Sequence, residues 1–413
     1  MNDPRFGDLL SEPLRNGLTR PKAVRGEGTK MVNMGELFAH RRIGDIEMSR
    51  VPVADRESRF LLAYGDLLFA RQSLVLAGAG LCSIFIGRDE ATFESHIIRA
   101  RLDPAKADSR YFAYYFSSTQ GRNRIESIVE QVAAAGIRSS DLSQLRVPCP
   151  PVEEQVGIAE TLSGIDDKIE HNRKTSAKLE ELARALFAFW FGVLDPDRAP
   201  HGWTVVSLSG HVEVTRGLSY TGAGLAVDGV PLHNLDSIFE GGGYKYEGIK
   251  HYRGDYKDRN LVRAGDLLVV NTEQGFDHLL IGFPALVPER FGDKSLYSAD
   301  LFRMKPSPHS HLTTRFLYLA LMSPRLRQLI VGYSNGTTVN HLAADGLRRP
   351  RLGVPPADVV QRFDRTVAPL FAKQQQLQLE SETLAQLRDL LLPKLMSGEI
   401  RLTEAEKAVA ETL

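Results

Sequence analysis

The segment Leu61-Leu-Ala-Tyr-Gly-Asp-Leu-Leu-Phe-Ala-Arg71 returns about 200 residues later as Leu261-Val-Arg-Ala-Gly-Asp-Leu-Leu-Val-Val-Asn271. Further matches occur in the same order on both sides of it, and the offset drifts to about 205. They pair Arg15-Asn-Gly-Leu-Thr19 with Thr215-Arg-Gly-Leu-Ser219, Asn33-Met-Gly-Glu-Leu-Phe38 with Asn234-Leu-Asp-Ser-Ile-Phe239, Phe112 and Tyr114 with Phe316 and Tyr318, and Pro150-Pro151 with Pro355-Pro356. A single match can arise by chance, but an ordered series with small drifts indicates an internal duplication.

Each half of this 413-residue chain begins with a segment in which Gly, Pro, Asn and Asp separate short apolar runs. This pattern predicts strands joined by turns, with a helix near residues 113–129 in the first half and near 314–331 in the second. We therefore expect an α+β fold class, with two modules of mixed strands and helices at residues 1–150 and 195–352.

Each module is followed by a stretch, residues 151–194 and 353–398, in which a seam of residues steps by four and three. The two series are Ile158, Leu162, Ile165, Ile169, Asn172, Ser176, Leu179, Ala183, Leu186, Trp190 and Phe363, Val367, Leu370, Gln374, Leu377, Ser381, Leu384, Arg388, Leu391, Leu395. A mean spacing near 3.5 residues predicts two long helices that pair as a coiled coil. Residues 399–413 are expected to form a C-terminal tail.

The direction of the two long helices follows from the order of the chain. The first helix delivers the chain from the first module to the second, so a second helix on the same seam must run back. We expect an antiparallel pair, with a pseudo-twofold axis relating the modules. Asn172 and Gln374 are polar seam positions of the kind that fix register at some cost in stability. The alternative is that each helix packs on its own module as a separate core.

Composition narrows the class of protein. With 43% hydrophobic and 25% charged residues, the chain is typical of a globular protein. The 51 basic and 51 acidic residues balance, so any surface for nucleic acid must be a local patch. The two cysteines, Cys82 and Cys149, lie far apart, which excludes a disulfide scaffold and favours a reducing cytosol. No apolar run reaches the length of a membrane span, and the start lacks a secretory signal. We expect a soluble, cytoplasmic protein.

Signatures of catalysis are missing from the sequence. Phosphate-loop, dinucleotide-binding, zinc-protease, amino-methyltransferase and nucleophile-elbow motifs are all absent. His309 and His311 form a close pair in a loop, and a chance surface pair explains them better than a metal site does. Asp166-Asp167-Lys168 resembles a nuclease motif, but it lies on a long helix, where a solvated face is the simpler explanation. We expect no catalytic site and no metal.

Two binding modules on a rigid helical spacer suit a long, roughly twofold partner such as duplex DNA. The repeated strands match while the polar segments after them differ, as two modules that read different sequences require. Arg suits guanine, Asn and Gln suit adenine, and Glu accepts from cytosine. The candidate DNA contacts are Arg71, Gln72 and Ser73; Arg138, Ser139 and Ser140; Asn271, Thr272 and Glu273; Asn335, Thr337 and Thr338; and Tyr244 and Lys245 in an aromatic and basic stretch. The alternative is that the segments after the strands are plain loops and that recognition lies elsewhere, such as residues 244–253.

A cluster of aromatic residues marks the end of the first long helix: Phe187, Trp190 and Phe191, with Phe189 between them. Aromatic anchors often dominate protein interfaces, so one hypothesis is that this cluster binds a partner subunit. The alternative is that it packs into the core of a module.

Several motifs resemble the specificity subunits of type I restriction–modification systems. Val147-Pro-Cys-Pro-Pro-Val-Glu-Glu-Gln-Val-Gly-Ile158 is similar to the segment that follows each of their target-recognition domains. Leu387-Arg-Asp-Leu-Leu-Leu-Pro-Lys-Leu-Met-Ser-Gly-Glu-Ile-Arg-Leu402 resembles the end of their second long helix, and His201-Gly-Trp203 the opening of a recognition domain. Two departures stand out. The first half lacks the Gly-Trp opening, so its first strand is expected to be short, and Ala357-Asp-Val-Val360 replaces the usual Glu-Glu-Gln, which leaves the start of the second long helix less defined.

The resemblance implies a non-catalytic subunit whose two target-recognition domains bind an asymmetric, bipartite sequence in double-stranded DNA, with the helices setting the gap. It also implies that the chain recruits two modification (adenine methyltransferase) subunits and, in complexes that cleave DNA, restriction subunits. S-adenosylmethionine, ATP and Mg²⁺ would belong to those partners, and this chain would bind no cofactor. Three alternatives stay open: a coiled-coil scaffold with protein-binding modules, the DNA-binding subunit of a modification-only complex, and a self-contained nuclease or methyltransferase.

Overall fold

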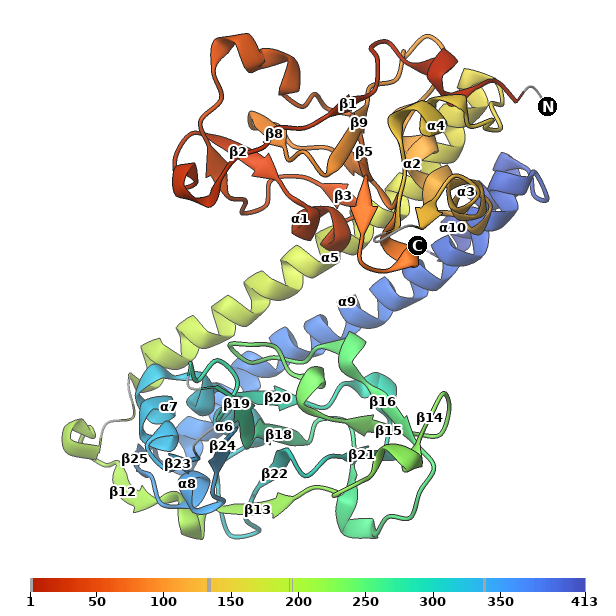
Figure 1. Ribbon diagram of the computed structural model, residues 1–413. Helices are drawn as coiled ribbons and strands as arrows, with labels where there is room; N and C mark the ends of the chain where they lie inside the picture. The colour runs from red at the N-terminus through yellow and green to blue at the C-terminus, as the bar shows by residue number, and fades with distance from the viewer. Residues whose placement is uncertain are drawn as a thin grey trace. The chain divides into compact units, whose positions relative to one another are not determined.

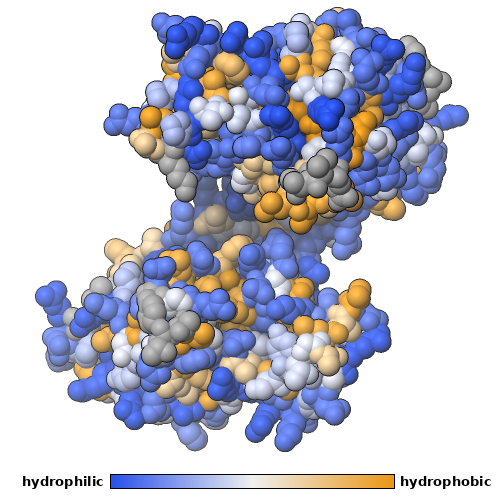
Figure 2. All heavy atoms as spheres, in the orientation of Figure 1, coloured by the Kyte–Doolittle hydropathy of each residue, from blue (hydrophilic) through white to orange (hydrophobic). Residues whose placement is uncertain are grey.

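The computed structural model describes residues 3–131, 135–192, 194, 196–275, 277–336 and 339–412. The chain divides into two compact units: unit 1 comprises Met1–Glu170 and Ser381–Leu413, and unit 2 comprises His171–Glu380. The two longest helices, α5 (Val152–Phe191) and α9 (Ala357–Ser397), each run from one unit into the other (Figure 1). The mixture of strands and helices in both units confirms the α+β class. Hydrophilic residues cover most of the visible surface, and apolar residues interrupt it in patches (Figure 2).

Unit 1 is built on a five-stranded sheet with the buried strand β5 at its centre. Its order is β1 (Arg15–Asn16), β9 (Ile97–Ala100), β5 (Leu67–Ala70), β7 (Cys82–Phe85) and β3 (Arg42–Ile43). Two three-stranded sheets complete the unit, one of β4 (Arg50–Val51), β2 (Thr29–Val32) and β8 (Ala91–Phe93), the other of β10 (Glu130–Gln131), β11 (Ala135–Gly136) and β6 (Gln72–Ser73). The shorter helices are α1 (Met34–Ala39), α2 (Ser109–Ser117), α3 (Thr119–Glu126), α4 (Ser139–Gln144) and α10 (Leu402–Thr412).

Unit 2 repeats this plan around the buried strand β18. One sheet has the order β13 (Val212–Arg216), β22 (Leu301–Pro306), β18 (Leu267–Val270), β20 (Pro284–Leu286), and a second has β14 (Leu225–Ala226), β16 (Lys250–Tyr252), β15 (Val230–His233), β21 (Ser295–Tyr297), β17 (Leu261–Val262). Smaller sheets join β19 (Thr272–Gln274), β24 (Val339–Leu342) and β23 (Ser334–Asn335), and β12 (Thr204–Ser207) with β25 (Arg351–Val354). The helices are α6 (Thr314–Met322), α7 (Pro324–Val331) and α8 (Asp345–Arg348).

The glycines of the first repeated motif show why the two halves fold alike. A Cβ at Gly17 would lie 2.1 Å from the carbonyl oxygen of Phe93, and one at Gly217 would lie 2.2 Å from that of Ser298. Any side chain would therefore push these strands apart. The backbone N–H of the next residue, Leu18 or Leu218, then donates a hydrogen bond of 2.8 or 2.7 Å in the corresponding place. The duplication seen in the sequence is thus repeated in the backbone contacts.

Two details of the sequence-based expectation are refined. A single helix was expected near residues 113–129 and another near 314–331. Each is divided into two, α2 and α3 or α6 and α7, because Ser118 caps α3 and Pro324 begins α7. The expectation that the first half opens on a short strand is confirmed: a single bridge, Arg5 to Arg146, stands where the second half has the four-residue pair β12–β25. Helix α9 begins at Ala357, directly after the second Pro-Pro pair.

Helices α5 and α9 pair in opposite directions within each unit. In unit 1, Arg388 of α9 donates a hydrogen bond of 2.6 Å to Asp166 of α5. In unit 2, the side-chain amides of Asn172 and Gln374 donate across the pair to the carbonyls of Leu377 (3.5 Å) and Ser176 (3.0 Å). Every position of both expected seams is buried or half-buried. The two polar seam residues therefore tie the helices together at one register, as expected.

The helices also contribute side chains to the cores of the units. They therefore both pair with each other and pack on the modules, so both alternatives apply. Ile158 and Leu162 share a core with Phe112 in unit 1, and Phe187 and Phe191 share one with the aromatic residues of unit 2. Helix α10 occupies most of the expected C-terminal tail and packs in unit 1, where Ala405 is fully buried. Among the described residues, the structure contains no helix with the length and apolar character needed to cross a membrane.

Candidate nucleic-acid interface

In both units the central buried strand ends in a loop. The same backbone hydrogen bond, the clamp, closes each loop at its base. The backbone N–H of Gly80 donates to the carbonyl of Ala70 at 2.8 Å, and that of Gly282 donates to Val270 at 2.9 Å. Both glycines have positive φ, 65° and 79°, which favours glycine. The loops at residues 71–80 and 271–282 therefore leave and re-enter equivalent frameworks, although the second is two residues longer.

A small three-stranded sheet brings a second polar segment to each loop. In unit 1, β6 pairs with β11 so that Gln72 lies opposite Gly136. In unit 2, β19 pairs with β24 so that Thr272 lies opposite His341. The two candidate clusters that lie far apart in each half of the sequence thus meet at one edge of each unit.

The candidates of the first loop lie at the surface of unit 1. Arg71 is half-buried, and its guanidinium has no hydrogen bond or ion pair with the described residues. Gln72 is exposed, and its Oε1 lies 3.2 Å from Nδ1 of His96, which is also exposed. The Oγ of Ser73 accepts a hydrogen bond from the N–H of Val75 at 3.2 Å, so this hydroxyl shapes the turn.

The second cluster of unit 1 is also at the surface. Arg138 forms an ion pair of 2.6 Å with Glu130, and both side chains remain largely exposed. Ser139 and Ser140 begin α4, where the Ser140 hydroxyl donates to Asp141 at 3.2 Å. Because an exposed ion pair is weak, Arg138 can exchange its partner for a phosphate at little cost.

Unit 2 differs from expectation, because Asn271, Thr272 and Glu273 are buried. The Asn271 amide donates to the carbonyl of Ala299 at 3.0 Å, and the Thr272 hydroxyl donates to Asn271 at 2.8 Å. The two carboxylate oxygens of Glu273 accept the N–H groups of Leu279 (2.7 Å) and Ile281 (2.9 Å). The sequence predicted these three side chains as DNA contacts, but the structure buries them, and they hold the loop together from inside.

A groove beside this loop presents other polar side chains instead. It is lined by Arg216, Asn335 and His341, with Asn271 at its wall, and all but Asn271 are exposed. Sequence reasoning did not select Arg216 or His341. Arg216 belongs to a repeated motif, so the sequence could have indicated it. His341 could be found only from the structure, where it pairs with Thr272. Thr337 and Thr338 lie outside the described residues.

The aromatic and basic stretch is only partly available. The hydroxyl of Tyr244 forms a hydrogen bond of 2.7 Å with Nδ1 of His233, and its ring packs on Tyr246 and Phe291. Burial raises the pKa of the Tyr244 hydroxyl well above its usual value. Lys245 is half-buried and its amine has no partner among the described residues. Tyr244 therefore supports the fold, which corrects its expected role, and Lys245 remains a candidate contact.

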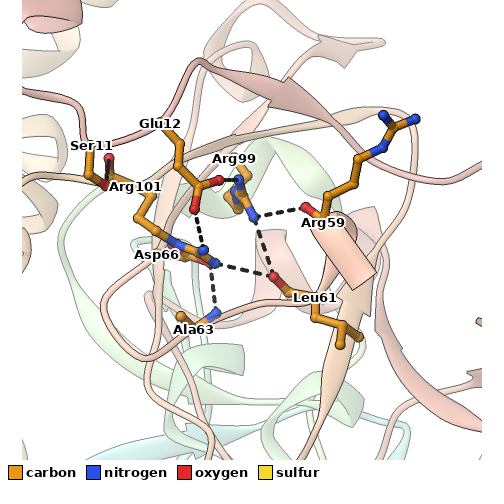
Figure 3. A network of polar contacts seen from close by, with 8 residues as sticks. All are labelled: Ser11, Glu12, Arg59, Leu61, Ala63, Asp66, Arg99 and Arg101. Atoms are coloured by element: carbon orange, nitrogen blue, oxygen red, sulfur yellow. Dashed lines mark hydrogen bonds and ion pairs between the residues drawn. The ribbon is translucent and has the colours of Figure 1, made fainter. Parts of the chain in front are cut away.

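The repeated Gly-Asp-Leu-Leu motif anchors a network of charges inside unit 1 (Figure 3). Asp66 accepts two hydrogen bonds of 2.8 Å from Arg101, and Glu12 binds Arg99 at 2.6 Å and Arg101 at 2.7 Å. The hydrogen bonds to Asp66 raise the pKa of Arg101. In unit 2, Asp266 lies 4.0 Å from Arg303 and 3.7 Å from Lys305. These basic side chains lie next to carboxylates within the fold, which leaves them less available to a ligand.

The aromatic cluster at the end of α5 lies mainly in the core of unit 2. Phe187 and Phe191 are buried, with ring centroids 5.3 and 5.1 Å from that of Phe316. Trp190 is half-buried against Phe363. The hypothesis that these three residues bind a partner is therefore wrong for Phe187 and Phe191, since no partner can reach them. Phe189 is the exposed member, with 86% of its surface accessible.

Across the described ranges, no cluster of three or more His, Cys, Asp or Glu side chains is arranged to hold a metal ion. The buried thiol of Cys82 has a strongly raised pKa because of desolvation, so it is not a nucleophile. What the arrangement offers is two polar edges of different composition on a shared framework.

Comparisons with known proteins agree with this architecture. A family model described as the type I restriction modification DNA specificity domain matches residues 44–181. The chain is 25% identical over 319 residues to the specificity subunit of the type I restriction enzyme MjaIX from Methanocaldococcus jannaschii, covering 72% of this chain and 70% of the relative. It is 27% identical over 328 residues to the HindI specificity subunit from Haemophilus influenzae, covering 64% and 71%.

Among solved structures, the S subunit of a type I restriction–modification system from M. genitalium matches 95% of both chains, with a TM-score of 0.56 and 16% identity. The duplicated units and paired long helices thus define the fold of a type I specificity subunit. The matches in sequence likewise make this chain similar to type I restriction enzyme specificity subunits.

Proposed function

We propose that this chain is the DNA sequence-specificity subunit of a type I restriction–modification complex, and that each unit reads one half of a bipartite, asymmetric sequence in double-stranded DNA. The observation that carries the proposal is the pair of loops at residues 71–80 and 271–282. Their clamps are equivalent, while their exposed side chains differ. Two equal frameworks with unequal tips are what a protein needs to recognise two unrelated half-sites.

The exposed polar groups differ in kind between the two units. Unit 1 offers Arg71, Gln72 and Arg138, which suit guanine, adenine and phosphate. Unit 2 offers Gln274, His341 and Arg216, with Asn335 nearby. We assign direct reading of bases to the loop residues Arg71, Gln72 and Gln274, and phosphate contacts to the exposed arginines.

Chemistry is assigned to partner subunits. We propose that the chain is not an enzyme, recruits two modification (methyltransferase) subunits, and leaves S-adenosylmethionine, ATP and Mg²⁺ to its partners. Restriction subunits join in complexes that cleave DNA; a modification-only complex is the second form of the same proposal. The support is the absence of catalytic motifs from the sequence. Helix α5 exposes two apolar side chains, Leu182 and Phe189. They are seven residues apart and so lie on one face of the helix, where a modification subunit could dock.

The proposal is tested by sequencing methylated DNA from a host that expresses the modification subunit with and without this chain. We expect methylation of one bipartite sequence only when the chain is present. The Arg71→Ala variant should relax the first half-site and leave the second unchanged, at a cost of roughly 1–3 kcal/mol. A host in which the chain directs no sequence-specific methylation, together with a chain that binds no specific duplex, would contradict the proposal.

A further inference from the structure

The tip of the first loop exposes three consecutive aliphatic side chains. Leu74 is 98% exposed, Val75 64% and Leu76 46%. The fold leaves these apolar side chains in water, so burying them against a ligand would stabilise a complex. Contiguous exposed apolar residues of this kind mark a binding surface more often than single ones do.

Contacts with neighbouring residues fix the base of this tip. The guanidinium of Arg122 donates to the carbonyls of Ala77 (3.0 Å) and Ala79 (3.1 Å), on the returning side of the loop. Gly78 is buried so closely that a Cβ there would lie 2.3 Å from Oγ of Ser73. An apolar group presented on such a rigid base loses little conformational entropy on binding.

The surroundings of the tip favour a polyanion as its occupant. Arg71 and Gln72 stand at the base of the loop, and the carbonyl of Arg71 accepts the N–H of Ile137 at 3.0 Å, which places Arg138 on the adjoining segment. The guanidinium of Arg71 has no partner among the described residues. An apolar protein surface would leave it unpaired, whereas DNA offers it phosphates and guanine. The second loop carries Gln274 and Gly275 at the positions that match Leu74 and Val75.

We propose that Leu74 reads a thymine of the first half-site, by packing against its 5-methyl group in the major groove. Among the four bases of DNA only thymine carries a methyl group there, and apolar side chains recognise it by contact. Val75 and Leu76 cover the flank of the contact and exclude water. This inference rests on the proposed function and adds one specificity-determining residue to it.

The test uses the full chain assembled with its modification subunits, and the duplex that carries the methylated sequence it directs. Each thymine of the first half-site is replaced in turn by uracil, which removes only the methyl group. We expect at least one replacement to weaken binding about fourfold, the equivalent of about 0.8 kcal/mol for one buried methyl. The Leu74→Ala variant should bind the thymine and uracil duplexes equally, because the contact is gone.

The matched control is Val227→Ala in unit 2, which removes an aliphatic side chain that is also 98% exposed. It should retain the preference for thymine. Leu74→Ala should melt at the temperature of the parent chain, since the side chain supports no core. A first half-site without thymine, equal binding of thymine and uracil duplexes by the parent chain, or a retained preference in Leu74→Ala would overturn the inference while leaving sequence-specific binding intact. A chain that binds no specific duplex would instead overturn the proposed function.

Discussion

The carboxylate of Glu273 decides the shape of the second loop. It accepts two backbone N–H groups across the loop, including that of the buried Ile281. We expect Glu273→Ala to lower the free energy of unfolding of unit 2 by about 1–3 kcal/mol for each N–H left unpaired. Affinity for the second half-site should fall while its sequence preference stays the same, as measured by denaturant unfolding and by binding to a panel of duplexes. Glu273→Gln keeps one acceptor and should lose less. Normal stability with an altered base preference would show that Glu273 reads DNA directly.

A second residue, His233, makes the stability of unit 2 depend on pH. Burial lowers the pKa of His233 to about 3, against about 6.5 for an exposed histidine. The unfolded chain therefore binds a proton that the folded chain excludes. The stability present above pH 6.5 is lost as the pH falls toward 3, by about 1.4 kcal/mol per pH unit for this group. Both tryptophans, Trp190 and Trp203, lie in unit 2, so their fluorescence reports its unfolding. The His233→Gln variant should show a shallower decline between pH 6.5 and 4. Equal declines would show that His233 titrates normally.

At the scale of the elements, the aromatic cluster of α5 has some members in the core of unit 2 and one at the surface. Phe189→Ser should leave stability within about 0.5 kcal/mol of the parent and weaken association with the modification subunit, because only an exposed ring is removed. Phe187→Ala is the matched control and should destabilise unit 2 by about 3–5 kcal/mol, since it empties a buried site. Thermal unfolding and titration with the modification subunit separate the two effects. Unchanged association of Phe189→Ser would remove this face of α5 from the interface.

The paired helices also allow a test of spacing. One heptad inserted into α5 and one into α9, at the level where Gln374 lies beside Ser176, keeps the seam and lengthens each helix by about 10 Å. Because a base pair rises about 3.4 Å, we expect the same half-sites with a gap about three base pairs longer. Sequencing of methylated DNA reads the gap. A heptad in α5 alone is the control, since it breaks the seam and should destabilise the pair. An unchanged gap in the double insertion would show that the helices do not set it.

For the whole molecule, the purified chain should hydrolyse neither DNA nor ATP and should transfer no methyl group, since these reactions are assigned to its partners. Assays with radiolabelled S-adenosylmethionine, ATP and plasmid DNA measure all three. Adding the modification subunits should restore methylation at the bipartite site. Turnover that follows the chain through purification in the absence of any partner would contradict the assignment.

The sequence predicted those parts of the molecule that depend on local patterns. The repeat around Gly-Asp-Leu-Leu predicted two equal modules, and the spacing of the seam predicted α5 and α9 and the polar contacts of Asn172 and Gln374. It did not predict the burial of Asn271 and Glu273, because that depends on β24 and on the closure of the loop. The residues that bind the Pro-Pro pairs also could not be predicted. In unit 1 the side chain of Gln155 donates to the carbonyl of Pro150 at 2.8 Å, and in unit 2 the ring of His311 lies 2.9 Å from the carbonyl of Pro355. An equivalent contact is made there by a residue that no local motif connects to it.

The division of the chain gives unit 2 one continuous segment and unit 1 two separate ones. During synthesis from the N-terminus, unit 2 has all of its residues once position 380 has left the ribosome. Unit 1 began earlier, yet it still lacks the side chains of Leu384, Leu391, Leu395 and Ala405, which lie in its core. Unit 1 is therefore the last to close although it is the first to emerge. A nascent chain that ends near position 380 carries a finished second unit and an open first one, whose unfilled core is a target for chaperones and proteases.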